Sequence, residues 1–91
     1  MQNFKKIYLI LRTLERAMKS GEIEELFRLG IAERELISLC EMLQDEGYIK
    51  GFHIGEQKIG IYDGVKITLR GLEYLNTNPL MENARKELSG I

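Results

Sequence analysis

The sequence predicts one small α+β domain, in which three helices are followed by a β-hairpin and a further C-terminal helix. Apolar residues recur at helical spacing up to about residue 46. After Gly47 this pattern gives way to short stretches rich in β-branched and aromatic residues. Helical spacing returns after Thr68. With 91 residues, the chain has room for a single hydrophobic core.

The first helix is predicted over Asn3–Ser20, with Gly21 as its stop. Its inward stripe consists of five apolar residues at helical spacing: Ile7, Ile10, Leu11, Leu14 and Met18. The opposite face carries three cations, Lys5, Arg12 and Arg16, and Leu9 is expected to be exposed among them. This helix is therefore expected to be apolar on one side and basic on the other.

Two further helices are predicted before Gly47. The second is short and covers Glu22–Leu29, and the third runs from about Ala32 to Glu46. A tight turn at Leu29-Gly30-Ile31 joins them, as in a helix-turn-helix. The third helix presents Leu36, Leu39, Cys40 and Leu43 to the core. Gly47 is its expected C-terminal cap.

The hairpin is predicted from two β-rich stretches, Tyr48–Ile54 and Lys58–Tyr62, with a turn over residues 55–57. Asp63-Gly64 signals a second reversal, after which Val65–Ile67 forms a short third strand. Thr68 is a good N-cap for a helix over Leu69–Asn76. Gly71 is unfavourable inside that helix, which suggests close packing against a neighbour.

A last short helix is predicted over Leu80–Leu88, after the helix-breaking residues 76–79. It is expected to carry Leu80, Ala84 and Leu88 on one side. The predicted organisation is a domain over residues 1–77 and a C-terminal tail or short helix over residues 78–91. The residues expected to be largely buried are Ile10, Leu14, Leu26, Leu36, Cys40, Leu43, Leu72 and Leu75.

Composition excludes several classes of protein. No apolar run approaches the roughly 20 residues that a membrane span requires. Arg12, Glu15 and Arg16 interrupt the apolar N-terminal stretch, so it does not resemble a signal peptide. The single cysteine excludes an internal disulfide. A cytoplasmic protein without a membrane partner is expected.

The sequence offers no pattern typical of an enzyme or of a metal or cofactor site. His53 is the only histidine and Cys40 the only thiol, and neither has partners at a suitable spacing. The glycines do not form a phosphate-binding loop, because no GKS or GKT follows them. The carboxylates are scattered over the predicted helix surfaces. We therefore expect no catalytic residues, no metal and no cofactor.

Three stretches carry a family resemblance: Leu29-Gly30-Ile31, the residues from Leu43 to Ile49, and those from Ile67 to Leu75. Together they resemble the winged helix-turn-helix superfamily over about residues 2–77. Within it the chain is most similar to the YjcQ-like proteins, small winged-helix proteins of Gram-positive bacteria and their phages. The resemblance implies three helices followed by a wing, but it assigns no activity. Ala32 departs from the usual pattern, since a Ser, Thr or Asp cap is typical there.

The fold admits a weak DNA-binding regulator, phage- or prophage-encoded, as one hypothesis. Its expected DNA-binding residues are Arg28, Arg34, Ser38, Lys50, Lys58 and Lys66. The chain has a formal net charge of −1, however, and five acids stand against one arginine in residues 33–46. Because phosphate neutralisation supplies much of the affinity for DNA, this balance allows only modest, salt-dependent binding.

The alternative hypothesis is a protein-interaction or dimerisation module that does not bind DNA. The first helix has a formal charge of +4 (five cations and one acid) and the third −4, which favours docking or self-association. The expected interface residues are Leu9, Arg12, Arg16, Leu80 and Leu88, and a homodimer is expected. A basic strip across the third helix and the wing would favour DNA. Basic charge confined to the first helix would favour a protein partner.

Overall fold

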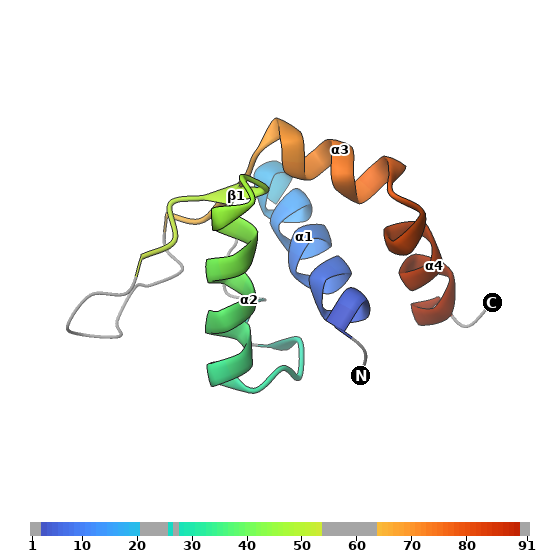
Figure 1. Ribbon diagram of the computed structural model, residues 1–91, viewed down its shortest axis with the longest axis horizontal. Helices are drawn as coiled ribbons and strands as arrows, with labels where there is room; N and C mark the ends of the chain where they lie inside the picture. The colour runs from blue at the N-terminus through green and yellow to red at the C-terminus, as the bar shows by residue number, and fades with distance from the viewer. Residues whose placement is uncertain (1–2, 21–25, 27, 54–63, 90–91) are drawn as a thin grey trace.

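The computed structural model describes residues 3–20, 26, 28–53 and 64–89. The helices in this part of the chain are α1 (Asn3–Ser20), α2 (Glu33–Asp45), α3 (Leu69–Thr77) and α4 (Pro79–Leu88). Two short strands, β1 (Ile49–Lys50) and β2 (Lys66–Ile67), lie between α2 and α3. The α+β class is confirmed, and the order of elements is that of a winged helix with a further C-terminal helix (Figure 1).

Helix α1 is the central element and has the predicted bounds. It lies between α2 and α4, and α3 crosses near one of its ends (Figure 1). Ile7, Ile10, Leu11 and Leu14 are buried as predicted, but Met18 is 59% exposed. Met18 is exposed because the apolar stripe of α1 extends beyond the part of the helix that the other described elements cover. The expected exposure of Leu9 is also wrong, because Leu9 is half-buried.

Helix α2 begins and ends close to the predicted positions. Gly47 follows it with a φ of 82°, and the Tyr48 amide donates to the Leu43 carbonyl at 2.9 Å, so the predicted glycine cap is confirmed. Ala32 makes no side-chain capping bond at the other end. The predicted helix over residues 22–29 lies largely outside the described residues. Leu26, which is described, is buried as expected.

The two strands pair in antiparallel fashion, with Ile49 opposite Ile67 and Lys50 opposite Lys66. The first strand is shorter than predicted because Gly51 has a φ of 82°, which takes the chain out of the extended conformation. The predicted third strand is confirmed over Lys66–Ile67. The predicted strand over residues 58–62 and the turn before it lie outside the described residues.

Helix α3 starts at the predicted cap. The Thr68 side chain accepts a hydrogen bond from the Gly71 amide at 3.0 Å. Gly71 packs against the chain after α2, and a Cβ added there would lie 2.1 Å from the Tyr48 carbonyl oxygen. The predicted reason for a glycine in this helix is therefore confirmed. Leu75 is buried, whereas Leu72 is only half-buried, since it lies at the edge of the face that packs on α1.

Helix α4 contacts both α1 and α3. Asn78 caps it, because its side-chain oxygen accepts from the Leu80 amide at 2.8 Å. The expected apolar side is wrong in part: Met81 and Ala84 are buried, while Leu80 is 43% and Leu88 40% exposed. The inward row starts at Met81 rather than at Leu80, which rotates Leu80 away from α1.

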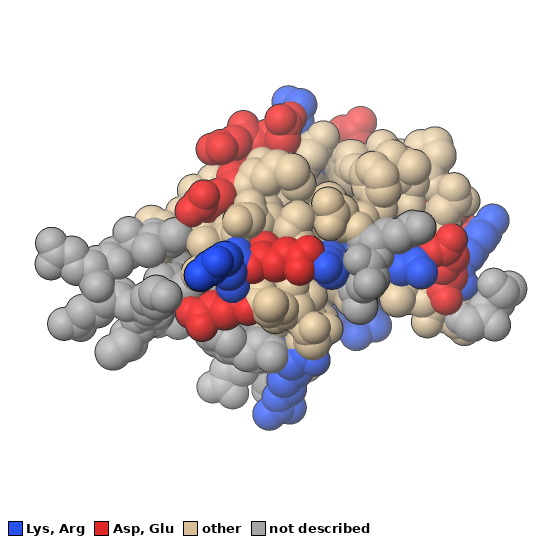
Figure 2. All heavy atoms as spheres, turned by 60° about the horizontal axis from the view of Figure 1, so that its bottom comes forward, with Lys and Arg blue, Asp and Glu red and all other residues tan. Residues whose placement is uncertain are grey.

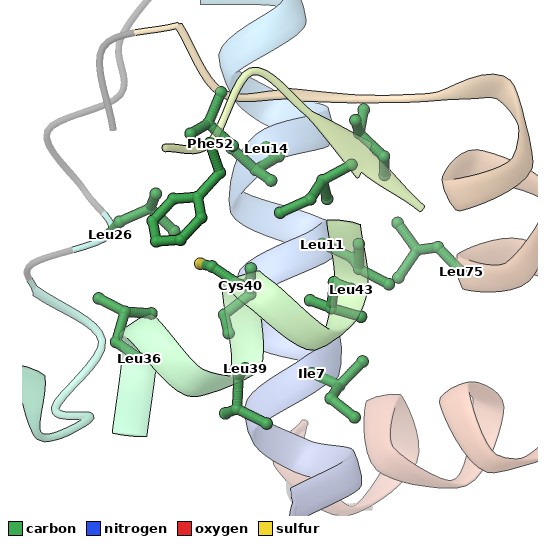
Figure 3. Packing of buried hydrophobic residues seen from close by; sticks show 14 of the residues in the cluster. Ile7, Leu11, Leu14, Leu26, Leu36, Leu39, Cys40, Leu43, Phe52 and Leu75 are labelled. Atoms are coloured by element: carbon green, nitrogen blue, oxygen red, sulfur yellow. The ribbon is translucent and has the colours of Figure 1, made fainter. Parts of the chain in front are cut away.

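The hydrophobic core lies between α1, α2 and the strand pair. Leu36, Leu39, Cys40 and Leu43 of α2 belong to one buried cluster with Ile7, Leu11 and Leu14 of α1 (Figure 3). Phe52 closes the core on the side of the wing, and Gln44 holds its backbone with two hydrogen bonds of 2.6 and 2.8 Å. Burial of each large apolar side chain stabilises the fold by roughly 1.5–3 kcal/mol.

Candidate functional site

An open groove lies between α1, α4 and the segment before α2. It has a volume of about 450 Å3. Its lining combines three half-exposed leucines with four arginines and three hydroxyl side chains. The lining residues are Tyr8, Leu9, Arg12, Thr13, Arg16, Arg28, Leu29, Arg85, Leu88 and Ser89. We call this feature the α1–α4 groove. Apolar walls with a few polar groups are typical of sites that bind a side chain or a small molecule.

Three elements bring the four arginines together. Arg12 and Arg16 are one helical turn apart on α1, Arg28 precedes α2, and Arg85 lies in the last turn of α4. Arg12 pairs with Glu15 on its own helix. Among the described residues, Arg28 is exposed and makes no ion pair. The groove is therefore the place where cations from distant parts of the sequence converge.

Arg85 is held by Glu82, one turn earlier in α4. Two hydrogen bonds join them, from Nε at 3.1 Å and from Nη2 at 2.6 Å. The bond from Arg85 lowers the pKa of the Glu82 carboxyl, so this carboxyl stays ionised. The pair fixes the guanidinium plane and leaves its other N–H groups for a further acceptor.

Thr13 is the most deeply buried polar side chain of the groove. Its exposed fraction is 5%, and its hydroxyl makes no hydrogen bond within the described part of the chain. Buried hydroxyl groups are normally hydrogen-bonded. Thr13 is therefore a polar group that lines the groove without a hydrogen-bond partner among the described residues.

The groove unites most of the interface residues that the sequence suggested. Leu9, Arg12, Arg16 and Leu88 all line it, while Leu80 lies apart, exposed on another side of α4. Sequence reasoning missed Thr13 and Arg85. Thr13 stands one turn from Ile10 on the inward side of α1, which was a usable signal. Arg85 becomes part of the site only because α4 packs on α1.

The residues suggested for DNA binding are dispersed. Arg34 and Ser38 are exposed on α2, Lys50 and Lys66 face each other across the strands, and Arg28 lines the groove. Lys58 lies outside the described residues. On the face shown in Figure 2, basic and acidic side chains alternate, and no continuous basic strip is visible.

Helix α2 presents an acidic exposed surface. Glu41, Asp45 and Glu46 are all exposed, and Arg34 is the single cation of the helix. Part of the charge contrast between α1 and α2 is paired inside the domain, because Lys6 of α1 forms an ion pair with Glu35 of α2. Lys5 pairs in the same way with Glu87 of α4 at 3.0 Å. Some of the charges that make up the predicted contrast thus form ion pairs that join helices within the domain.

The described residues include no group of three or more potential metal ligands. Cys40 is fully buried, and desolvation raises the pKa of its thiol to about 12. A thiol in that state is neutral and unreactive at ordinary pH. His53 is exposed after β1. Of the two residues most often involved in nucleophilic chemistry, Cys40 is thus buried and His53 is exposed.

Comparison with known proteins identifies the family. None of the described helices is long and apolar enough to cross a bilayer. No curated protein and no solved structure matches the chain. Residues 8–91 match the family described as YjcQ protein, which covers all the elements from the middle of α1 to α4. The chain therefore belongs to the YjcQ protein family.

Proposed function

We propose that this chain is a non-catalytic protein-interaction module of the cytoplasm, which binds a segment of a partner protein in the α1–α4 groove. The observation that carries the proposal is the composition of the groove, where Leu9, Leu29 and Leu88 lie among four arginines. Interfaces between proteins are enriched in arginine next to apolar anchors and depleted in lysine. The groove has this composition, and its described lining residues include no lysine.

The charge on α2 supports a protein partner over DNA. In a winged helix the corresponding helix enters the major groove, and its exposed side chains meet base edges and phosphates. Here Glu41, Asp45 and Glu46 occupy that exposed surface and would repel the backbone of DNA. The concentrated positive charge lies instead at the groove, where α1 supplies two of the four arginines.

Site-specific photo-crosslinking tests the proposal. A benzoylphenylalanine residue replaces Ser89, at the rim of the groove, or Ser38, on the exposed side of α2, in cells that produce the full chain. Both serines are exposed, so neither replacement disturbs the core. We expect protein adducts from position 89 and none from position 38. Adducts from position 38 alone, or no adduct from position 89, would contradict the proposal.

A second candidate function is weak binding to nucleic acid through the base of the wing. Lys50 and Lys66 are directly opposite each other in the strand pair, and both are exposed. Like charges in this position destabilise a sheet, so a site for phosphate groups would account for them.

Anisotropy of a labelled DNA duplex, measured over a range of salt concentrations, tests the second candidate. Replacement of Lys50 and Lys66 by Gln should abolish binding and flatten its salt dependence, by about one unit of slope per lysine. Replacement of Arg85 by Gln, far from the strands in the sequence, is the control. If no duplex is bound at low salt, this candidate function is wrong.

A further inference from the structure

We infer that the partner segment is acidic and carries at least one large apolar side chain, with its carboxylates on the arginines and its apolar group on the leucines. This inference rests on the proposed function and adds the chemistry of the partner. Three features of the α1–α4 groove carry it: the charge, the apolar lining and the Thr13 hydroxyl, which has no hydrogen-bond partner in the described part of the chain.

The charge of the groove calls for an anion. Among the described residues, four arginines line it, and two glutamates, Glu15 and Glu82, pair with them. Arg28 makes no ion pair within the described part of the chain, so its guanidinium is available to an anion. Arginine binds carboxylates through parallel N–H···O bonds and loses little entropy on doing so, which favours it over lysine for this task.

Carboxylates suit the site better than phosphate groups. The last turn of α4, with Arg85 and Leu88, lies in the groove, and a helix C-terminus carries a partial negative charge. A doubly charged phosphate would be repelled more strongly there than a singly charged carboxylate. Arg12 and Arg85 already hold glutamate side chains, so their geometry is compatible with carboxylate pairing.

The apolar part of the lining indicates that the partner segment carries an apolar side chain as well as a negative charge. Leu9 and Leu29 are half-buried and Leu88 is 40% exposed, and all three line the same groove. Covering them removes apolar surface from water, which a free anion or a nucleic-acid backbone does poorly. A volume of about 450 Å3 has room for a few side chains of a partner segment.

Thr13 supplies a further contact for the partner. Its hydroxyl is buried in the lining and lacks a hydrogen-bond partner in the described chain. A carboxylate or backbone carbonyl of the bound segment would accept from it. Such a bond distinguishes a segment that enters the groove from one that touches only the exposed arginines, because Thr13 is 5% exposed.

Selection from a library of random dodecapeptides by the full chain tests the inference. We expect the selected peptides to be enriched in Asp and Glu together with Leu, Ile or Phe. Replacement of Arg28 by Gln, or of Leu88 by Ala, should weaken their binding roughly tenfold. The matched controls are Arg34→Gln, an exposed arginine on α2, and Leu80→Ala, a leucine of α4 with nearly the same exposure outside the groove.

Several outcomes would overturn the inference. These are selection of peptides without acidic residues, no enrichment, or binding that Arg28→Gln and Leu88→Ala leave unchanged. Sedimentation of the same variants provides one more such outcome. If the wild-type chain is a dimer and these variants are monomers, the occupant of the groove is a second copy of the chain. Crosslinks from position 89 with non-acidic selected peptides would refute the partner chemistry and leave the proposed function standing. Absence of both crosslinks and peptides would refute the two together.

Discussion

The hydroxyl of Thr68 donates a hydrogen bond to the Gly47 carbonyl oxygen at 2.6 Å and so joins the end of α2 to the start of α3. The Thr68 hydroxyl oxygen also accepts a hydrogen bond from the Gly71 amide, and the Thr68 amide donates to the Tyr48 carbonyl at 3.0 Å. One side chain therefore caps a helix and fixes the crossing of two chain segments. This crossing fixes where β1 and β2 lie relative to α2 and α3.

Replacement of Thr68 by Val should destabilise the domain by about 1–2 kcal/mol, because both bonds of the hydroxyl are lost while the shape is kept. Thr68→Ser retains the hydroxyl and is the matched control, expected within about 0.5 kcal/mol of the wild type. Urea unfolding followed by circular dichroism measures both. A Ser variant that loses stability while the Val variant stays near the wild type would mean that the methyl group, rather than the bonds, is responsible.

Truncation of Leu14 or Leu43 to Ala should lower the free energy of unfolding by about 2–5 kcal/mol, since both side chains are 1% exposed in the core. Met18→Ala, in the same helix as Leu14, should change it by less than about 0.5 kcal/mol because Met18 is exposed. Denaturant melts compare the three variants. A stable Leu14→Ala variant would show that the helix faces are misassigned.

Replacement of Thr13 by Val should stabilise the free protein by about 1 kcal/mol, because it removes a buried hydroxyl that has no partner among the described residues. The same change should weaken binding of acidic peptides, which lose a hydrogen-bond donor. Thr13→Ser keeps the donor and should restore binding. Thermal melts and peptide titrations measure the two effects, and a Val variant that is less stable yet binds normally would assign Thr13 a purely structural role.

Stability should fall as the pH rises above about 9, through ionisation of Cys40. Burial raises the pKa of its thiol from 9.0 to about 12 in the folded chain, so above pH 9 the unfolded state loses this proton first. The free energy of unfolding then decreases by up to about 1.4 kcal/mol per pH unit. Cys40→Ala lacks this contribution and should show a shallower decline. Parallel declines in urea melts from pH 8 to pH 10 would contradict the assignment.

Local signals in the sequence predicted much of the fold. Asn3–Ser20, the Gly47 cap and the Thr68 cap were all predicted, because helix spacing and capping depend on residues a few positions apart. Gly71 was informative because only a close neighbour makes a glycine favourable inside a helix. The helix bounds and the two caps are thus set locally, whereas Gly71 signals a contact between distant segments.

The remainder depends on how the helices pack. Leu9 and Arg12 were expected on a solvent-facing basic side of the first helix, yet α4 approaches that side and makes it one wall of a groove. The rotation of α4, which buries Met81 and leaves Leu80 exposed, decides which of its residues reach the site. Apolar spacing in so short a helix is compatible with both rotations, so the sequence alone did not reveal the convergence of Arg85 with Arg12.

Helix α4 packs on α1, with Met81 fully buried and Lys5 paired to Glu87. The first helix and the last helix of the described chain thus cover part of each other's surface. During translation, α1 leaves the ribosome long before α4 is made. A nascent chain that ends at Thr77 contains α1, α2, the two described strands and α3 but exposes the part of α1 that α4 later covers. Folding can therefore reach its final state only after α4 has emerged, and the groove is formed at that same moment.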